Sequence, residues 1–77
     1  MRKQKHLRKR YKRFQELLIE ARQEAGLSQE ALAERIGQPQ SYVSKCESGV
    51  RRLDVVEFIE VMEAIGSDPV AFIKKLT

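Results

Sequence analysis

One short segment of the sequence, residues 39–49, carries the side chains best suited to recognising another molecule. Pro39 opens it and Gly49 closes it, as these residues do in helices, although most of the segment is polar. At 100° per residue, five polar side chains of this expected helix fall within an arc of about 140°: Gln40, Ser41, Ser44, Lys45 and Ser48. Their amide, hydroxyl and ammonium groups are the kinds that hydrogen-bond to base edges and phosphates.

The opposite side of the same expected helix is suited to packing. Tyr42, Val43 and Cys46 lie there, with Cys46 as a small apolar filler. Glu47 also lies inward, where we expect its carboxylate to accept hydrogen bonds from backbone N–H groups. An ordinary surface helix has a similar composition. The neighbouring segments must therefore show whether this helix recognises another molecule or is only solvated.

The residues before this segment predict a second short helix joined to it by a tight turn. Ser28 is a good N-cap, the apolar pattern runs to about Ile36, and Gly37 suits a left-handed position after the last turn. One or two residues then remain before Pro39. Two helices joined so closely must cross steeply, which predicts a helix-turn-helix.

Such a helix pair assigns expected roles to the polar side chains. Gln40 and Ser41, at the start of the second helix, are placed to meet base edges, and a glutamine can bond an adenine bidentately. Gln29 and the residues after the second helix, Arg51 and Arg52, are expected beside the DNA backbone, where contacts set register rather than sequence preference.

Backbone N–H groups offer a further way to bind phosphate. We expect free N–H groups near Gln29 and Gln38, where two helices begin, to bond phosphate oxygens. An alternative stays open for the charged residues, because Arg51 and Arg52 could instead pair with Glu47 or Asp54.

Three further helices are expected around this pair. Apolar residues at steps of three and four predict a helix that ends at Gly26 and could begin as early as Leu7. A second helix spans residues 55–65, with Asp54 and Glu57 forming a capping box, and a third covers residues 69–76. The fold class is therefore all-α with five helices and no strand.

The charge of the chain is unevenly distributed. Among 77 residues there are 15 Lys and Arg and 11 Asp and Glu, which gives a net charge of +4. Residues 1–13 hold eight of the basic residues and no acid, so the rest carries seven bases against eleven acids. We divide the chain into a basic arm, residues 1–10, and one domain, residues 11–77. The arm is either attracted to nucleic acid or a solvated tail, and both interpretations stay open.

Catalysis and metal binding find little support in the sequence. The single histidine, His6, lies in the basic arm, and the single cysteine, Cys46, lies on the docking side of a helix. This spacing fits neither a nucleophilic pair nor a metal site, and there is no glycine-rich phosphate loop. We expect no enzymatic activity and no cofactor. No run of about 20 apolar residues and no signal peptide is visible, so we expect a cytoplasmic protein.

The segment LSQEALAERIGQPQSYVSKCESGVRRLD resembles the core pattern of the lambda-repressor-like, Cro/C1-type (XRE) helix-turn-helix transcriptional regulators. The resemblance extends from Phe14 to about Leu76. It implies a five-helix DNA-binding domain in which Gln29 binds the DNA backbone and Arg51 meets phosphates. Cys46 departs from the pattern, since the family often has an aromatic residue there. The positions that the resemblance places toward the major groove are Gln40, Ser41, Ser44 and Lys45.

From this resemblance we expect a transcriptional regulator, a repressor that binds a short double-stranded operator as a homodimer. Two alternatives remain: a protein-interaction module such as an antitoxin, and a controller protein of a restriction-modification system. Dimerisation also follows from apolar residues that one small core struggles to absorb, because Leu17 and Ile19 lie off the main stripe of their helix. We expect the interface on the last helix, with Phe72 as its anchor. The expected interface residues are Val70, Phe72, Ile73 and Leu76.

Overall fold

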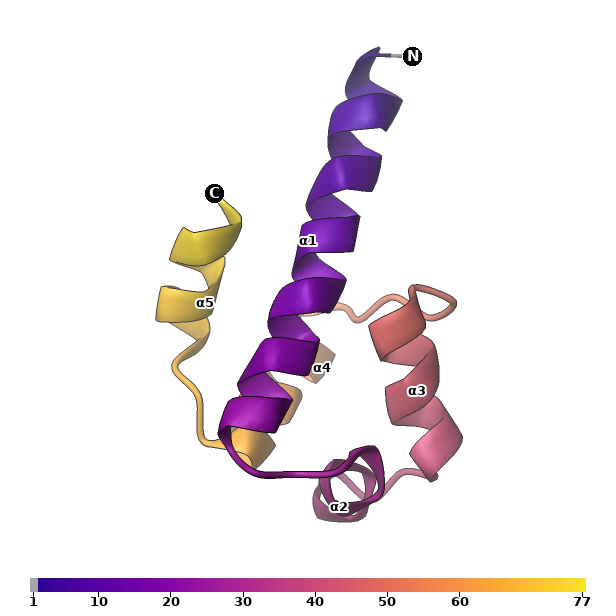
Figure 1. Cartoon of the computed structure of the whole chain (residues 1–77), viewed down its shortest axis with the longest axis vertical. Helices are drawn as coiled ribbons and strands as arrows, with labels where there is room; N and C mark the ends of the chain where they lie inside the picture. Colours follow the sequence, from indigo (N-terminus) through magenta and orange to yellow (C-terminus); the bar gives the residue numbers. More distant parts are fainter. Residues whose placement is uncertain (1) are drawn as a thin grey trace.

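The computed structural model describes the backbone of residues 2–77 and the side chains of residues 7–77, so the side chain of His6 lies outside the described part. Five helices follow one another there (Figure 1): α1 (Arg2–Glu24), α2 (Gln29–Arg35), α3 (Gln40–Ser48), α4 (Val55–Ile65) and α5 (Pro69–Leu76). The all-α architecture is confirmed. None of the described helices is both long and apolar enough to cross a membrane.

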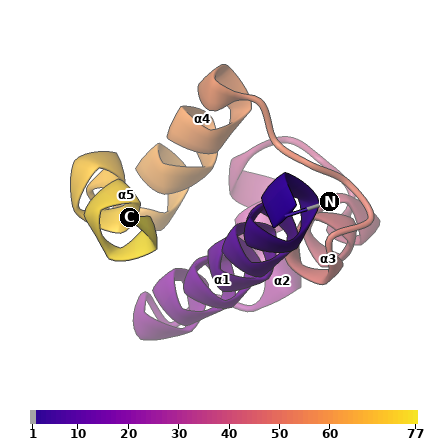
Figure 2. The same ribbon diagram turned by 90° about the horizontal axis from the view of Figure 1, so that it is seen from above.

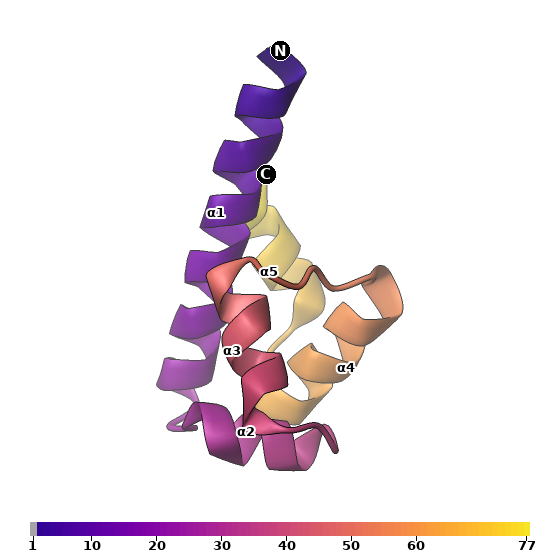
Figure 3. The ribbon, with the colours of Figure 1, turned by 90° about the vertical axis from the view of Figure 1, so that its right-hand side faces the viewer.

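The long helix α1 is the centre of the arrangement. α3 and α5 lie on opposite sides of α1 and each packs against it (Figures 1 and 2), while α2 contacts both α3 and α4. In the side view α2 crosses below α3, and α4 lies to the right of α3 (Figure 3). The first turns of α1 extend past the other helices, which gives the chain principal extents of 38 × 24 × 21 Å. The α2–α3 pair is therefore held on one side of a single central helix.

Local capping explains why the short helices begin where they do. The Ser28 hydroxyl accepts the N–H of Ala31 at 3.0 Å, and Asp54 and Glu57 form the expected capping box at the start of α4. α3 differs, because Pro39 is its N-cap and provides no side-chain hydrogen bond. The position of α3 thus depends on tertiary contacts more than on its own cap.

The core joins α1, α4 and α5 through three aromatic rings. The centroids of Phe14 and Phe58 are 5.7 Å apart, and Phe72 lies 5.4 Å from the first ring and 5.0 Å from the second. Such pairs add about 0.5–1.5 kcal/mol each beyond their area burial. The prediction that Phe72 anchors a dimer was wrong, because this ring is only 5% exposed and fills the core of its own chain.

One other expectation about α1 needs correction. Leu17 was expected to require a second surface outside the core, but it is 3% exposed and belongs to the core cluster, because α5 packs against that side of α1. Ile19 is half-buried. The helix also begins at Arg2, so residues 2–10 of the basic arm continue the same helix as the domain that follows. The proposed boundary after residue 10 therefore marks the end of a strongly basic segment and not the end of a helix.

A tight contact between α1 and the end of α3 generates the first prediction. Gly49 ends α3 with a φ of 87°, and a Cβ added there would overlap the side-chain amide of Gln15. Gly37 also has a positive φ, 67°, but a Cβ there would meet nothing within 4 Å. We expect Gly37→Ala to lower the free energy of unfolding by about 1–2 kcal/mol, the cost of a left-handed non-glycine residue. Gly49→Ala should lower it slightly more, because the end of the Gln15 side chain must shift and its 3.5 Å contact with the Glu47 carbonyl is lost.

Urea unfolding followed by circular dichroism measures both variants. Equal losses for the two substitutions would show that the Gln15 side chain moves aside freely, and that α1 does not constrain the end of α3.

Candidate nucleic-acid interface

Helix α3 has the two faces expected from its sequence. Val43, Cys46 and Glu47 are between 3% and 8% exposed, so the packing face is buried. On the opposite face Gln40, Ser41, Lys45 and Ser48 are exposed and Ser44 is half-buried. The helix therefore docks through one side and presents amide, hydroxyl and ammonium groups on the other.

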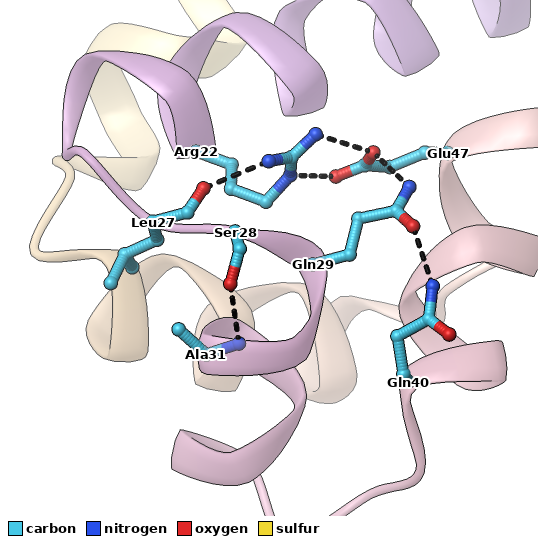
Figure 4. A network of polar contacts seen from close by, with 7 residues as sticks. All are labelled: Arg22, Leu27, Ser28, Gln29, Ala31, Gln40 and Glu47. Carbon is cyan, nitrogen blue, oxygen red and sulfur yellow. Dashed lines mark hydrogen bonds and ion pairs between the residues drawn. The ribbon is translucent and has the colours of Figure 1, made fainter.

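The docking of α3 depends on a buried ion pair. A carboxylate oxygen of Glu47 lies 2.6 Å from Nε of Arg22 on α1, and the second oxygen accepts another guanidinium N–H at 3.1 Å (Figure 4). The same guanidinium donates to the carbonyl of Leu27 at 2.8 Å. Glu47 was expected to accept from backbone N–H groups, but all of these donors are side chains. A buried carboxylate needs a charged partner, and Arg22 supplies it.

Gln29 links this ion pair to the exposed face of α3. Its amide nitrogen donates to Glu47 at 2.9 Å, and its amide oxygen accepts from Nε2 of Gln40 at 2.8 Å (Figure 4). The negative charge of Glu47 decides which end of the Gln29 amide faces it, because only the NH₂ end can donate. The orientation of Gln29 then requires Gln40 to present a donor in turn.

This chain of contacts leaves the amide of Gln40 ready for a further partner. Its oxygen and its second N–H are not used by Gln29. One acceptor and one donor are what a glutamine needs to bond an adenine through N6 and N7. The side chain is thus pointed by the protein while its recognition groups stay free.

The other predicted contacts on α2 and α3 are placed as follows. Gln38 is exposed, but its backbone N–H donates to the carbonyl of Ala33 at 2.9 Å. The N–H of Gln38 itself is therefore not free, so the expected phosphate-binding N–H groups near this residue would be those that follow it at the start of α3. Ser48 donates its hydroxyl to the carbonyl of Lys45 at 3.2 Å, and no side-chain hydrogen bond engages the ammonium of Lys45 among the described residues.

Arg51 has a partner that the sequence did not suggest. Its guanidinium contacts both carboxylate oxygens of Glu57, at 2.7 and 3.3 Å, and lies 4.7 Å from the ring centroid of Tyr42. The alternative pairings of Arg51 with Glu47 or Asp54 are not formed. Hydrogen bonds from the Asp54 backbone and then from Arg51 lower the pKa of Glu57, so this contact lasts to acidic pH. Arg51 therefore fixes the α3–α4 connection as well as offering positive charge.

Arg52 is held differently, since its guanidinium carbon lies 3.9 Å from the centroid of the Tyr11 ring on α1. This geometry is a cation–π contact. No ion pair of Arg52 occurs within the described residues. Its charge remains free for an external anion.

Two further titratable groups beside this surface stay neutral. Burial raises the pKa of the Tyr42 phenol and of the Cys46 thiol above their usual values. The thiol is therefore unreactive, in line with its expected role as filler. Among the described residues, no group of His, Cys, Asp and Glu is arranged to hold a metal ion.

Sequence reasoning missed Arg22 and Tyr11 as parts of this site. A signal for Arg22 was present, because an inward-facing Glu47 requires a buried cation. The choice among the basic residues of the body could not be made without the packing of α1 on α3. Tyr11 was assigned to the apolar stripe of its helix, and the arginine above its ring comes from a segment about forty residues away.

The steep helix pair and the exposed polar face of α3 define a helix-turn-helix protein, and comparison with known proteins agrees. Residues 18–72 match a family model described as helix-turn-helix. The structure of an XRE-family like protein from Pseudomonas syringae pv. tomato str. DC3000 is 47% identical, with a TM-score of 0.91 over 96% of this chain and 90% of that chain. The chain belongs to the XRE family of DNA-binding helix-turn-helix transcriptional regulators.

More distant structures share the fold. The wild-type restriction-modification controller protein C.Esp1396I is 24% identical, with a TM-score of 0.78 over 87% of each chain. A mutant of that controller protein, also 24% identical, gives a TM-score of 0.80 over 87% of this chain and 89% of its own. A search of curated protein sequences finds no significant match.

Proposed function

We propose that the protein is a repressor that reads a short operator with α3 and binds it as a homodimer. The observation that carries the proposal is the Glu47–Gln29–Gln40 chain of contacts, which orients an amide on an exposed helix face. Occupancy of an operator is sufficient for repression and needs no additional catalytic or effector site.

Base recognition falls to the start of α3 and positioning to its surroundings. Gln40 and Ser41 are placed for base edges, Ser44 and Lys45 continue the same face, and the side chain of Gln29 keeps one N–H for a phosphate. The residues that flank this face and serve the DNA backbone are the exposed Gln38, Ser48 and Arg52 and the half-buried Arg51.

A homodimer is supported by an apolar surface that the monomer leaves in water. Val70 is 60% exposed and Ile73 is 48% exposed, both on α5, while Leu76 is half-buried. Ile73, Leu76 and Val55 of α4 line one hollow of about 170 Å³. Two symmetric copies also suit DNA, since half-sites about 34 Å apart lie on one face of the duplex. The proposed interface therefore keeps Val70, Ile73 and Leu76 and loses Phe72.

The reading role of α3 predicts a contrast between two neighbouring amides. Gln40→Ala should weaken binding to the preferred site by about 1–3 kcal/mol and relax preference at one base pair. Gln38→Ala should weaken all sequences about equally, because its expected partner is a phosphate. Competition binding with a set of single-base operator variants, selected first with the wild-type protein, measures both effects.

If Gln40→Ala leaves affinity and preference unchanged, α3 is not the reading helix. A wild-type protein that binds no duplex tightly, but does bind a second protein, would favour the interaction-module alternative.

The dimer proposal predicts that Ile73→Glu gives a folded monomer with sharply reduced operator affinity. Each apolar side chain removed from a two-fold interface is lost twice, at about 1.5–3 kcal/mol each. Val56→Glu is the matched control, because Val56 is 67% exposed on α4 and lines neither this hollow nor the surface assigned to DNA. Sedimentation velocity measures the oligomeric state, and circular dichroism verifies folding.

A wild-type protein that stays monomeric at high micromolar concentration, both free and on its operator, would contradict the dimer. The same conclusion would follow if Ile73→Glu sedimented as a dimer like the control.

A further inference from the structure

A second basic feature adjoins the C-terminal end of the exposed face of α3, between α1 and the α3–α4 connection. A hollow of about 220 Å³ opens there, and none of the nine described residues that line it is acidic. Three of them are arginines that come from two distant parts of the sequence: Arg8, Arg51 and Arg52. The hollow therefore concentrates positive charge from two segments of the chain.

Two of these arginines have no internal counterion. Neither Arg8 nor Arg52 forms an ion pair within the described residues, and residues 1–6 contain no acid that could provide one. Arg51 is bound to Glu57, but this leaves the other two charges uncompensated. Like charges gathered in one hollow repel each other, so an anion placed between them is favoured.

Contacts among the residues that line the hollow hold their side chains in place. The ring of Tyr11 holds the Arg52 guanidinium at 3.9 Å, and Tyr11 itself lines the hollow one helical turn after Arg8. On another wall, the side-chain amide of Gln15 lies against Gly49 and donates to the Glu47 carbonyl at 3.5 Å. The guanidinium of Arg52 is thus oriented in advance, which reduces the entropy lost on binding.

We propose that this hollow binds one phosphate of the DNA backbone, so that α1 contributes a contact outside the recognition helix. The inference rests on the proposed DNA-binding function. Guanidinium groups match phosphate oxygens in a bidentate manner. Ser48 connects the two surfaces, because it belongs to the polar face of α3 and also lines the hollow. A duplex that contacts α3 therefore passes the mouth of the hollow with its sugar-phosphate backbone.

The test uses the full chain and operator duplexes in which one phosphate at a time is replaced by an uncharged methylphosphonate. The wild-type protein should lose affinity at one phosphate position, and Arg8→Gln should lose clearly less there, because only Arg52 then offers an unpaired charge to that phosphate. Arg8→Gln should also reduce the slope of log K against log salt by about 0.9, the value for one phosphate contact. Lys9→Gln is the matched control, since Lys9 carries the same charge on the same helix but does not line the hollow.

The outcomes separate this site from the proposed function. If Arg8→Gln loses as much affinity as the wild type at every methylphosphonate position, or if Lys9→Gln shows the same reduced loss at the same position, the hollow does not bind phosphate. Binding by α3 would then still stand, provided that Gln40→Ala changes base preference. If the wild-type protein binds no duplex, both the proposed function and this site are wrong. Circular dichroism of Arg8→Gln should match the wild type, because Arg8 is exposed.

Discussion

The buried ion pair between Arg22 and Glu47 is the constraint on which the recognition surface depends. Glu47 is 8% exposed, and its oxygens are satisfied by side chains from α1 and α2. Removing one partner of such a pair leaves an unpaired buried charge and typically destabilises a protein by about 3–5 kcal/mol. Because α3 has no side-chain N-cap of its own, this contact contributes to its position as well as to its stability.

The ion pair reaches the protein surface through one amide. Gln29 is half-buried, donates to Glu47 and accepts from Gln40, so a charge inside the domain sets the orientation of a side chain outside it. The aromatic cluster of α1, α4 and α5 belongs to one continuous core, which also includes Leu32 of α2 and Val43 of α3. The core and the recognition helix are thus connected through α1 and through the buried face of α3.

Patterns within single helices allowed the helix starts and the two faces of α3 to be predicted from the sequence. Capping at Ser28 and Asp54 fixed two helix starts, and the 100° periodicity separated the two faces of α3 correctly. Contacts between distant segments were not predictable. A helix of two turns such as α5 has apolar residues on several sides, so its sequence does not show that Phe72 faces inward. Likewise, Arg51 pairs with Glu57 because of the path of the α3–α4 connection, which the sequence does not show.

A double-mutant cycle between Gln29→Met and Gln40→Ala tests the coupling most directly. Gln29→Met removes the hydrogen bonds of Gln29 to Glu47 and Gln40 but keeps the Arg22–Glu47 pair. The quantity to measure is the ratio of the affinities for two operators that differ at one base pair. A phosphate contact of Gln29 contributes equally to both affinities and therefore cancels in this ratio. Gln29→Met should reduce that ratio. In the Gln29→Met background, Gln40→Ala should reduce the ratio less than it does in the wild-type protein, which corresponds to a coupling free energy of about 0.5–3 kcal/mol between the two side chains. Strict additivity of the two substitutions would contradict the role of the buried charge in orienting Gln40.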